Sequence, residues 1–300
     1  MDYSLIEALC AECGVAFERG ALLSRHCSMR IGGACDILVK PNSEEALRSL
    51  LETCRGDDIP YFVLGRGSNV LFPDEGFRGC VILLGQEMGG VAVEGNRVTA
   101  GAGAALSAVC NAALENGLSG LEFAYGIPGT VGGALYMNAG AYGGEMKDVV
   151  TSCRYIDENG AFCEMPAEDM ELSYRHSVFA QRGCIITSVT MRLAAGERAQ
   201  IKARMDELMQ KRRDKQPLEF PSCGSTFKRP EGYFAAALIE ECGLKGCTVG
   251  GAQVSEKHSG FVINRGGATS RDVQELVKHI KRVVREQKGI ELECEMLIVR

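Results

Sequence analysis

The sequence contains no apolar run approaching the ~20 residues that span a membrane, and its N-terminus lacks the basic and apolar regions of a signal peptide. It also lacks an excess of basic residues, since 33 Lys and Arg stand against 39 Asp and Glu for a net charge of −6. An acidic chain of this kind is poorly suited to a general nucleic-acid surface. We therefore expect a soluble, cytoplasmic monomer with no membrane or nucleic-acid partner.

The fourteen cysteines lack the paired spacing of a disulfide framework or a metal site. Most lie in apolar or strand-like runs, as Cys80 does, where a free thiol packs as a small hydrophobic group. Cys10-x-x-Cys13 and Cys242-x4-Cys247 have no second Cys or His pair near them. We therefore expect free thiols in a reducing compartment and no bound metal.

Helical and strand-like segments follow one another without a regular βαβ order. Apolar spacing and capping residues predict helices over residues 2–18, 43–55 (with Asn42 as N-cap), 104–116, about 198–210, and 273–288. Alternation and turn residues predict strands at 61–64, 80–84, 91–100 (a hairpin turning at 94–96), 149–157, 161–165, 184–193 and 290–298. This order indicates an α+β protein of several lobes, with a domain boundary near 194–198.

Three glycine-rich loops follow predicted strands, at 65–69, 101–103 and 126–133. Glycine allows backbone N–H groups to approach a ligand closely and to point together, which suits a pyrophosphate. Val70 and Leu106 break the dinucleotide fingerprint G-x-G-x-x-G, and no G-K-[ST] of a P-loop occurs. One such loop alone is usually only a tight turn. Three of them, the last inside a long irregular segment, favour a site for an extended cofactor.

Two of these loops belong to longer runs that resemble a known family of flavoenzymes. The runs are G-R-G-S-N-V-L at 65–71 and A-Y-G-I-P-G-T-V-G-G-A-L-Y-M-N-A-G-A-Y-G-G at 124–144. Shorter matches are S-M-R-I-G-G (28–33), Y-R-H-S-V-F (174–179), G-S-T-F-K (224–228) and V-S-E-K-H-S-G-F-V-I-N (254–264). Together they are similar to the UDP-N-acetylenolpyruvoylglucosamine reductases, also called UDP-N-acetylmuramate dehydrogenases. The chain between 194 and 220 is short, so it resembles the branch without a tyrosine-bearing insertion.

The resemblance implies an FAD-binding module of the vanillyl-alcohol-oxidase (PCMH) type, built of two α/β lobes, and a C-terminal α/β substrate-binding domain. The implied boundaries are an N-terminal helix at 1–24, the FAD domain at 25–195 with lobes divided near 80–90, and the substrate domain at 196–300. The implied reaction is NADPH-dependent reduction of UDP-N-acetylglucosamine enolpyruvate to UDP-N-acetylmuramate through FAD, in peptidoglycan precursor synthesis. Alternatives are another FAD oxidase or dehydrogenase of the same superfamily, or a flavin-binding module without catalysis.

The resemblance also implies the residues that hold the small molecules. Expected at the FAD are Leu64, Gly65, Arg66, Gly67, Ser68, Asn69, Val70, Gly101, Ala124, Tyr125, Gly126, Pro128, Gly129, Val131, Gly132, Gly133, Asn138, Gly140, Ala141, Gly183 and Ile185. Expected at the substrate are Lys215, Lys228, His258 and Asn264.

Three residues are expected to be catalytic. On the resemblance, Ser225 gives a proton while reduced FAD gives a hydride, and Arg175 with Glu295 stabilises the charge that develops. The pattern alone leaves other interpretations open. Arg175 could be a surface arginine, and Glu295 could share a solvated strand face with Glu291 and Glu293. Serine is also a weak acid, so Ser225 needs a cation nearby.

The stretch 198–229 is locally basic, with nine Lys and Arg against four Asp and Glu. Lys202 and Arg204 are expected on a solvated helix face, and the basic residues of 211–215 near the substrate diphosphate. Arg229 stands where the family commonly has Asn, so a substrate contact at that position is left open. Ser222 and Cys223 are expected to form and pack the turn before Ser225.

Overall fold

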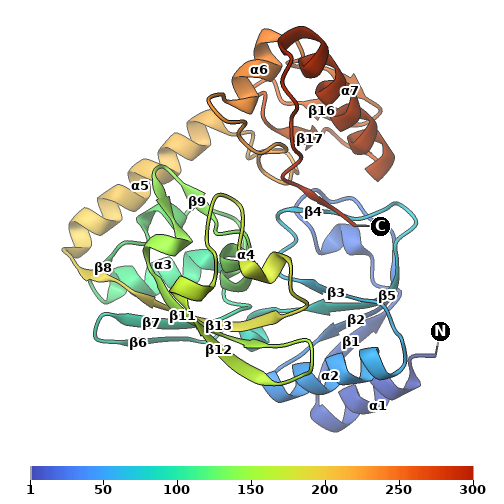
Figure 1. Ribbon diagram of the computed structural model, residues 1–300, viewed down its shortest axis with the longest axis vertical. Helices are drawn as coiled ribbons and strands as arrows, with labels where there is room; N and C mark the ends of the chain where they lie inside the picture. Colours follow the sequence, from blue (N-terminus) through green and yellow to red (C-terminus); the bar gives the residue numbers. More distant parts are fainter. Residues whose placement is uncertain (1, 300) are drawn as a thin grey trace. The chain divides into compact units, whose positions relative to one another are not determined.

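The computed structural model describes residues 2–299, which form two compact units, each assembled from separate stretches of chain (Figure 1). The first unit holds the N-terminal residues through Arg19, Ile37–Arg66 and Gly79–Lys211. The second holds Gly20–Asp36, Gly67–Arg78 and the chain from Arg212 onwards. The predicted domains are contiguous in sequence, whereas in the structure two short stretches from the N-terminal half belong with the C-terminal unit.

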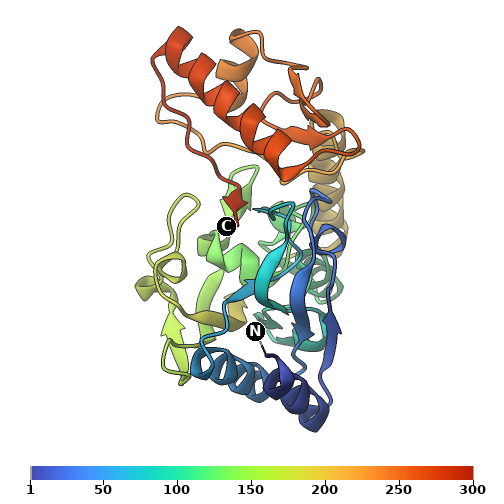
Figure 2. The same cartoon turned by 90° about the vertical axis from the view of Figure 1, so that its right-hand side faces the viewer.

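One sheet of the first unit has the strand order β1-β2-β5-β3. Its strands are β1 (Ala16–Arg19), β2 (Cys35–Lys40), β5 (Phe77–Leu83) and β3 (Tyr61–Leu64). Strand β3 pairs in parallel with β5, and β1 pairs antiparallel with β2. Helices α1 (Ser4–Cys13) and α2 (Glu44–Gly56) lie together on one face of this sheet (Figures 1 and 2). The apolar side of α2 packs there through Leu47, Leu50 and Leu51, which are buried.

The first helix is shorter than predicted, and the cap of the second is different. Helix α1 ends at Cys13 because Gly14 adopts a positive φ of 63°. Asn42 does not cap α2. Its amide donates instead to the carbonyls of Cys13 and Gly14, each at 3.3 Å. Ser43 is the N-cap of α2, and its Oγ accepts from the Ala46 N–H at 3.0 Å.

The second sheet of this unit is antiparallel, with the order β12-β11-β13-β7-β6. Its strands are β6 (Val91–Glu94), β7 (Arg97–Gly101), β11 (Val150–Ile156), β12 (Phe162–Pro166) and β13 (Ile185–Arg192). The two predicted hairpins are confirmed, since β6 pairs with β7 and β11 with β12. Helices α3 (Leu106–Glu115) and α4 (Val131–Tyr136) pack against the sheet. A small pair, β8 (Leu118–Ser119) with β14 (Ala194–Ala195), lies beside them.

Helix α4 was missed in the glycine-rich segment because two of its six residues, Gly132 and Gly133, are glycine, which disfavours a helix. A Cβ at Gly132 would lie 2.8 Å from the Cβ of Ala102, so only glycine allows this close packing. Thr130 caps the helix, and its Oγ1 accepts from the Gly133 N–H at 3.4 Å. Tertiary packing therefore overrides the weak helix propensity here.

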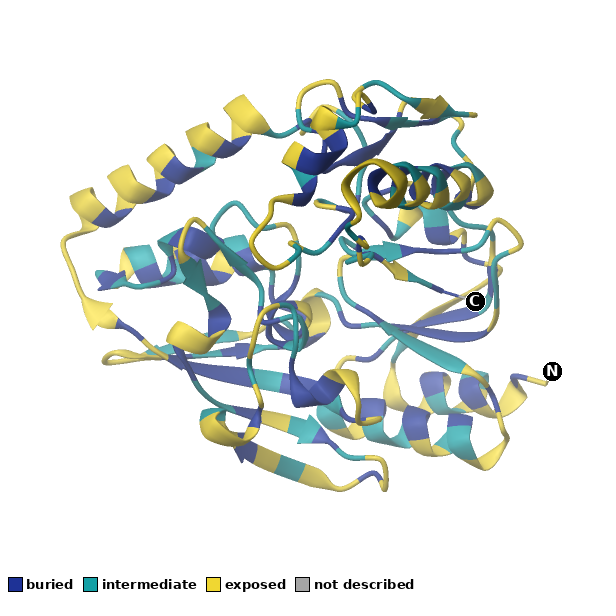
Figure 3. Cartoon of the chain, turned by 45° about the horizontal axis from the view of Figure 1, so that its top comes forward, coloured by how far each residue is buried: buried dark blue, intermediate teal, exposed yellow. Residues whose placement is uncertain are grey.

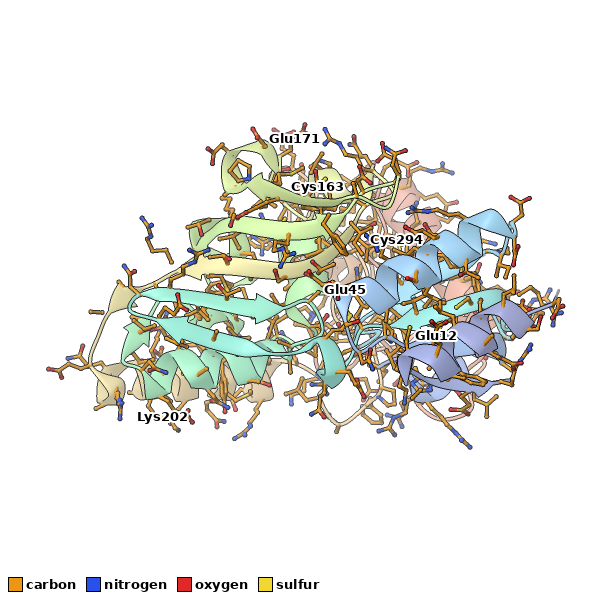
Figure 4. The ribbon with its side chains drawn as sticks, turned by 90° about the horizontal axis from the view of Figure 1, so that it is seen from below. Glu12, Glu45, Cys163, Glu171, Lys202 and Cys294 are labelled. Atoms are coloured by element: carbon orange, nitrogen blue, oxygen red, sulfur yellow. The ribbon has the colours of Figure 1, made fainter. Side chains whose placement is uncertain are left out.

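Helix α5 (Arg198–Lys215) confirms the predicted amphipathic segment, with Ile201, Met205 and Leu208 buried. Lys202 points away from the protein in Figure 4 and pairs with Asp206 one turn on, at 2.5 Å. Arg204 pairs in the same way with Glu207 at 2.6 Å. Both basic residues thus lie on a solvated helix face, as expected.

The second unit packs helices against a small antiparallel sheet, β15-β16-β17. The strands are β15 (Thr248–Val249), β16 (Ala252–Val254) and β17 (Val262–Asn264), and the helices are α6 (Ala235–Glu241) and α7 (Ser270–Lys288). Helix α7 has a buried and an exposed side (Figure 3) and ends at Gly289, where φ is 70°. Within residues 2–299, neither α7 nor any other helix combines the length and apolarity needed to cross a membrane.

The predicted strand over 290–298 is largely wrong as a regular element. Only β18 (Leu297–Ile298) is a strand, and it pairs in parallel with β4 (Val70–Leu71). The segment before β18 bonds instead to the loop around Thr226: Lys228 N–H donates to the carbonyl of Glu293 at 2.8 Å. The chain is extended but changes partners, so the alternation of apolar residues is present without one continuous ladder.

Candidate active site

Ser225 lies exposed in a loop whose following residue is held firmly. The N–H of Thr226 donates to the carbonyl of Gly260 at 2.8 Å, and its Oγ1 accepts from the Val262 N–H at 3.0 Å. Gly224, on the other side, has a φ of 72° that few other residues tolerate. The Ser225 hydroxyl makes no hydrogen bond to another residue of the described part, 2–299. The loop therefore presents a free hydroxyl on a fixed backbone.

The two residues predicted to shape this loop do so. The carbonyl of Ser222 accepts from the Ser28 hydroxyl at 2.6 Å. Cys223 is buried, and its thiol donates to the carbonyl of Val70 at 3.2 Å. Burial raises the pKa of the Cys223 thiol far above its ordinary value, so this thiol stays protonated and is no nucleophile.

This burial predicts how the cysteines react. Cys13 is exposed, whereas burial raises the pKa of Cys110 and of Cys153 to about 12. Alkylation of the native protein should modify Cys13 and spare Cys110, Cys153 and Cys223, as read by peptide mass spectrometry. A thiol reacts as the thiolate, and a raised pKa keeps these three thiols protonated. They should therefore remain unmodified when the pH is raised to about 9. Rapid native labelling of Cys223 would contradict the packing described for it.

Glu295 differs from the two glutamates that precede it on the same extended segment. Glu291 and Glu293 are exposed and pair with Arg285 at 3.4 Å and Lys228 at 2.5 Å, respectively. Glu295 is only partly exposed, and its N–H donates to the carbonyl of Thr226 at 2.9 Å. The structure therefore brings Glu295 beside the Ser225 loop, and the solvated-face interpretation holds for the other two acids.

The second half of the glycine loop at 65–69 is built against the same region. Gly67 has a φ of 60°, and a Cβ there would lie 2.4 Å from the carbonyl oxygen of His26. Asn69 Nδ2 donates to the carbonyl of Glu295 at 3.0 Å. Ser28 connects the two loops, since its hydroxyl reaches Ser222 O at 2.6 Å and Gly67 O at 3.3 Å. Sequence reasoning gave Ser28 no role, although it opens the motif S-M-R-I-G-G.

Arg175, in the first unit, lies in a tight turn closed by two hydrogen bonds between Ser173 and His176, at 3.2 and 3.1 Å. Its φ of 54° is unusual for a residue other than glycine, and such backbone conformations concentrate at functional sites. The guanidinium lies 5.1 Å from the centre of the Tyr174 ring and 3.5 Å from the carbonyl oxygen of Gly140. Arg175 is thus half-buried on a fixed turn, unlike an ordinary surface arginine.

Most residues predicted to bind the cofactor are exposed or half-buried, as a contact requires. The exceptions in the first unit are Leu64, Ala124, Val131 and Asn138, each no more than 1% exposed, and Gly132, which packs on Ala102. Gly67 is the buried exception in the second unit. Side chains without accessible surface cannot touch a ligand in this conformation, so these residues support the lining instead of forming it.

The four residues predicted to bind substrate differ in exposure. Lys215 is exposed, and Lys228 is half-buried beside Glu293. Asn264 is buried, its amide donates to Met29 O at 3.1 Å, and its Oδ1 accepts from two backbone N–H groups, so it supports the region around it.

His258 offers no cation for a diphosphate. Burial, the largest influence, lowers the pKa of its imidazole, so the ring is neutral at pH 7. Its Nδ1 accepts from the Gly260 N–H at 3.1 Å, and the ring packs edge-on against Phe261 at 4.9 Å. Residues 2–299 also contain no cluster of three His, Cys, Asp or Glu side chains that could hold a metal ion.

The chain is similar to known proteins over most of its length. A reductase from Clostridium perfringens, UDP-N-acetylenolpyruvoylglucosamine reductase, is 51% identical over 277 residues, covering 92% of this chain and 91% of its own. The chain belongs to the UDP-N-acetylenolpyruvoylglucosamine reductase family. The profile of the C-terminal domain of this reductase matches residues 216–299, and an FAD binding domain profile matches residues 35–165.

Solved structures agree with the family. The reductase from Thermus caldophilus superposes with a TM-score of 0.83 at 37% identity, covering 95% of this chain and all of that one. Cholesterol oxidase from B. sterolicum shares the fold alone, with a TM-score of 0.50 at 17% identity over 61% of this chain and 38% of its own. The predicted fold class, an α+β protein with an FAD-binding module and a C-terminal domain, is therefore confirmed.

Proposed function

We propose that this protein reduces UDP-N-acetylglucosamine enolpyruvate to UDP-N-acetylmuramate with NADPH and bound FAD. Family membership supports the reaction. The observation that carries the chemistry is the Ser225 hydroxyl, which has no hydrogen-bond partner among residues 2–299, on a loop that the Glu295 backbone bonds at Thr226. The protein acts in peptidoglycan precursor synthesis and therefore in cell-wall formation. We also propose that the protein is located in the cytoplasm and acts as a monomer.

The residues of the glycine loops fit FAD. A Cβ at Gly67 would lie 2.4 Å from the carbonyl oxygen of His26, and a Cβ at Gly65 would lie 2.5 Å from Oγ1 of Thr130, so both positions have room only for glycine. Arg66, between these two glycines, is exposed, and Ser68, which follows Gly67, is half-buried. Such a loop offers backbone N–H groups to a pyrophosphate. When bound, FAD takes electrons from NADPH and supplies a hydride to the substrate.

Ser225 supplies the proton in this reaction. Reduction of the enolpyruvyl ether puts hydride on the methylene carbon and a proton on the carbon that bears the ether oxygen. The donor must contact that second carbon from a fixed position. The Ser225 hydroxyl meets this requirement, because it has no hydrogen-bond partner among residues 2–299 and its loop is anchored at Thr226.

Arg175 stabilises, by its positive charge, the negative charge that moves onto the substrate carboxylate when hydride adds, and the Glu295 carboxyl group assists it by hydrogen bonding. A guanidinium matches a carboxylate with two parallel N–H groups, and its position on the Ser173–His176 turn fixes its direction. Glu295 helps to stabilise the enolic intermediate, and the hydrogen bond from its backbone N–H to the Thr226 carbonyl holds it next to the Ser225 loop. A fixed charge in the site costs no reorganisation during the step, which is why it accelerates the reaction.

The substrate diphosphate is held by basic residues of the second unit. Lys215 is the last residue of helix α5 and is exposed, and Lys228, which is half-buried, lies three residues after Ser225. Between 194 and 220 the chain holds only β14, α5 and a short connection, which supports the branch without the inserted tyrosine loop. Arg229 stacks on the exposed ring of Phe234 at 4.8 Å, and we assign it no contact to substrate.

A flavin spectrum and turnover assay test the proposal. The purified protein should show flavin absorbance or take up added FAD, and NADPH consumption should depend on UDP-N-acetylglucosamine enolpyruvate. A colourless protein that does not bind added FAD would overturn it. Oxygen consumption with an alcohol substrate, and no NADPH oxidation by the enolpyruvyl compound, would instead indicate an oxidase of the same superfamily.

A further inference from the structure

Asn138 follows helix α4 at the point where the chain turns towards the hairpin of β9 (Gly140–Ala141) and β10 (Gly144–Glu145). It is 0% exposed and has a positive φ of 41°. Among residues other than glycine, Asn and Asp tolerate this conformation best. Asn138 was predicted to bind FAD, but its side chain has no surface to offer a ligand.

The amide of Asn138 makes three hydrogen bonds, all to protein groups. Its Nδ2 donates to the carbonyl of Ser173 at 2.9 Å and to Oε2 of Glu145 at 2.7 Å. Its Oδ1 accepts from the backbone N–H of Lys147 at 2.9 Å. A backbone N–H can only donate and a carbonyl can only accept, so these partners fix the orientation of the amide. Asp cannot reproduce the two donated bonds.

The carbonyl that Asn138 contacts belongs to the first residue of the Arg175 turn. The same Ser173 oxygen accepts from the N–H of His176, which closes the turn at 3.1 Å. On the other side of Arg175, the hydroxyl of Ser177 donates to the carbonyl of Tyr136 at 2.7 Å, and Ser177 is also 0% exposed. The end of α4 therefore holds the turn both before and after Arg175.

Arg175 itself touches the same hairpin, since its guanidinium lies 3.5 Å from the carbonyl oxygen of Gly140. Glu171, before the turn, also has a positive φ of 51°, yet its side chain is exposed (Figure 4) and reaches the His176 ring at 3.9 Å. The unusual backbone of Arg175 is supported by the buried amide of Asn138.

We propose that Asn138 is a positioning residue that holds the Arg175 turn in its productive conformation. The inference rests on the proposed function, because it assumes that Arg175 acts on the substrate. Its physical basis is that catalysis by a fixed charge depends on the direction of that charge, and a misplacement of ~1 Å can cost about 10²-fold in rate.

The first test is amide hydrogen exchange, which does not depend on activity. In Asn138→Ala, exchange in peptides covering 173–178 should be roughly tenfold faster than in the wild-type protein. Ser259→Ala is the matched control, because Ser259 is also buried and its hydroxyl donates to Glu240 at 3.1 Å in the second unit. It should leave 173–178 unchanged. Unchanged exchange in Asn138→Ala would overturn the proposal.

The second test is a double-mutant cycle on the holoenzyme. Asn138→Ala should slow oxidation of the reduced protein by UDP-N-acetylglucosamine enolpyruvate about 10- to 100-fold and leave flavin reduction by NADPH within about twofold. In an Arg175→Ala background, the same change should cost less than about twofold, because its effect acts through Arg175. Equal losses in both backgrounds, or equal losses in both half-reactions, would overturn the proposal.

Ser177→Ala keeps the test decisive if Asn138→Ala fails to fold. It removes one hydroxyl and should give the same pattern, namely faster exchange at 173–178 and a loss confined to the substrate half-reaction. Normal exchange and kinetics in Ser177→Ala would then contradict the proposal. If the wild-type protein does not reduce the substrate, the proposed function fails, and the exchange comparison still decides whether α4 holds the turn.

Discussion

Replacing Ser225 with alanine should slow the reduction of UDP-N-acetylglucosamine enolpyruvate by about 10²–10³-fold or more, while FAD is still reduced by NADPH at close to the wild-type rate. The hydroxyl is the proposed proton donor, and it has no hydrogen-bond partner among residues 2–299 whose loss could disturb the fold. Rapid mixing of each half-reaction separately measures the two rates.

Ser222→Ala is the matched control for this variant. Ser222 lies in the same loop, but its hydrogen bond to Ser28 uses the backbone carbonyl, which alanine retains. It should therefore leave both half-reactions near the wild-type rates. If Ser225→Ala slows flavin reduction and substrate reduction equally, the loop supports the flavin site and Ser225 is not the proton donor.

Replacing Glu295 with glutamine should slow the substrate half-reaction by about 10²-fold, again without affecting flavin reduction by NADPH. Glutamine keeps the size of the side chain, and the backbone bonds to Thr226 and Asn69 do not involve it. The expected loss therefore reports the carboxyl group. Single-turnover kinetics of the variant measure it directly.

Glu293→Gln distinguishes a specific role from a general acidic surface. Glu293 lies two residues earlier and pairs with Lys228 at the surface, an interaction that typically contributes less than about 1 kcal/mol. We expect Glu293→Gln to be nearly normal in the substrate half-reaction. If Glu293→Gln is as slow as Glu295→Gln, the segment acts through its summed charge and the assignment of Glu295 is wrong.

Local sequence signals predicted those parts of the fold that depend on neighbours in the chain. The hairpin β6–β7 turns at Gly95-Asn96, and α7 ends at a glycine with positive φ, both as the residues indicate. Asn42 and Ser43 show where local signals stop being sufficient. Both residue types can cap a helix, but the Asn42 amide donates to carbonyls at the end of α1, because the fold brings that end of α1 close to it.

The same limit applies to the site. The motif isolates Ser225, but nothing in the alternation of 290–298 separates Glu295 from Glu291 and Glu293; that requires the bond to Thr226, a contact between distant segments. Asn138 and Asn264 were both predicted as ligands, and in the structure both are buried and bonded to protein groups. An asparagine in a loop can bind a ligand or its own surrounding backbone, and the sequence alone does not tell which partner lies within reach.

Anaerobic oxidation of the reduced protein tests the central claim most directly. The FAD-loaded protein is reduced with one equivalent of NADPH and mixed, without oxygen, with UDP-N-acetylglucosamine enolpyruvate. We predict that the absorbance of oxidised flavin returns rapidly and that UDP-N-acetylmuramate forms in equal amount. Flavin that stays reduced until oxygen is admitted would contradict the proposed reaction.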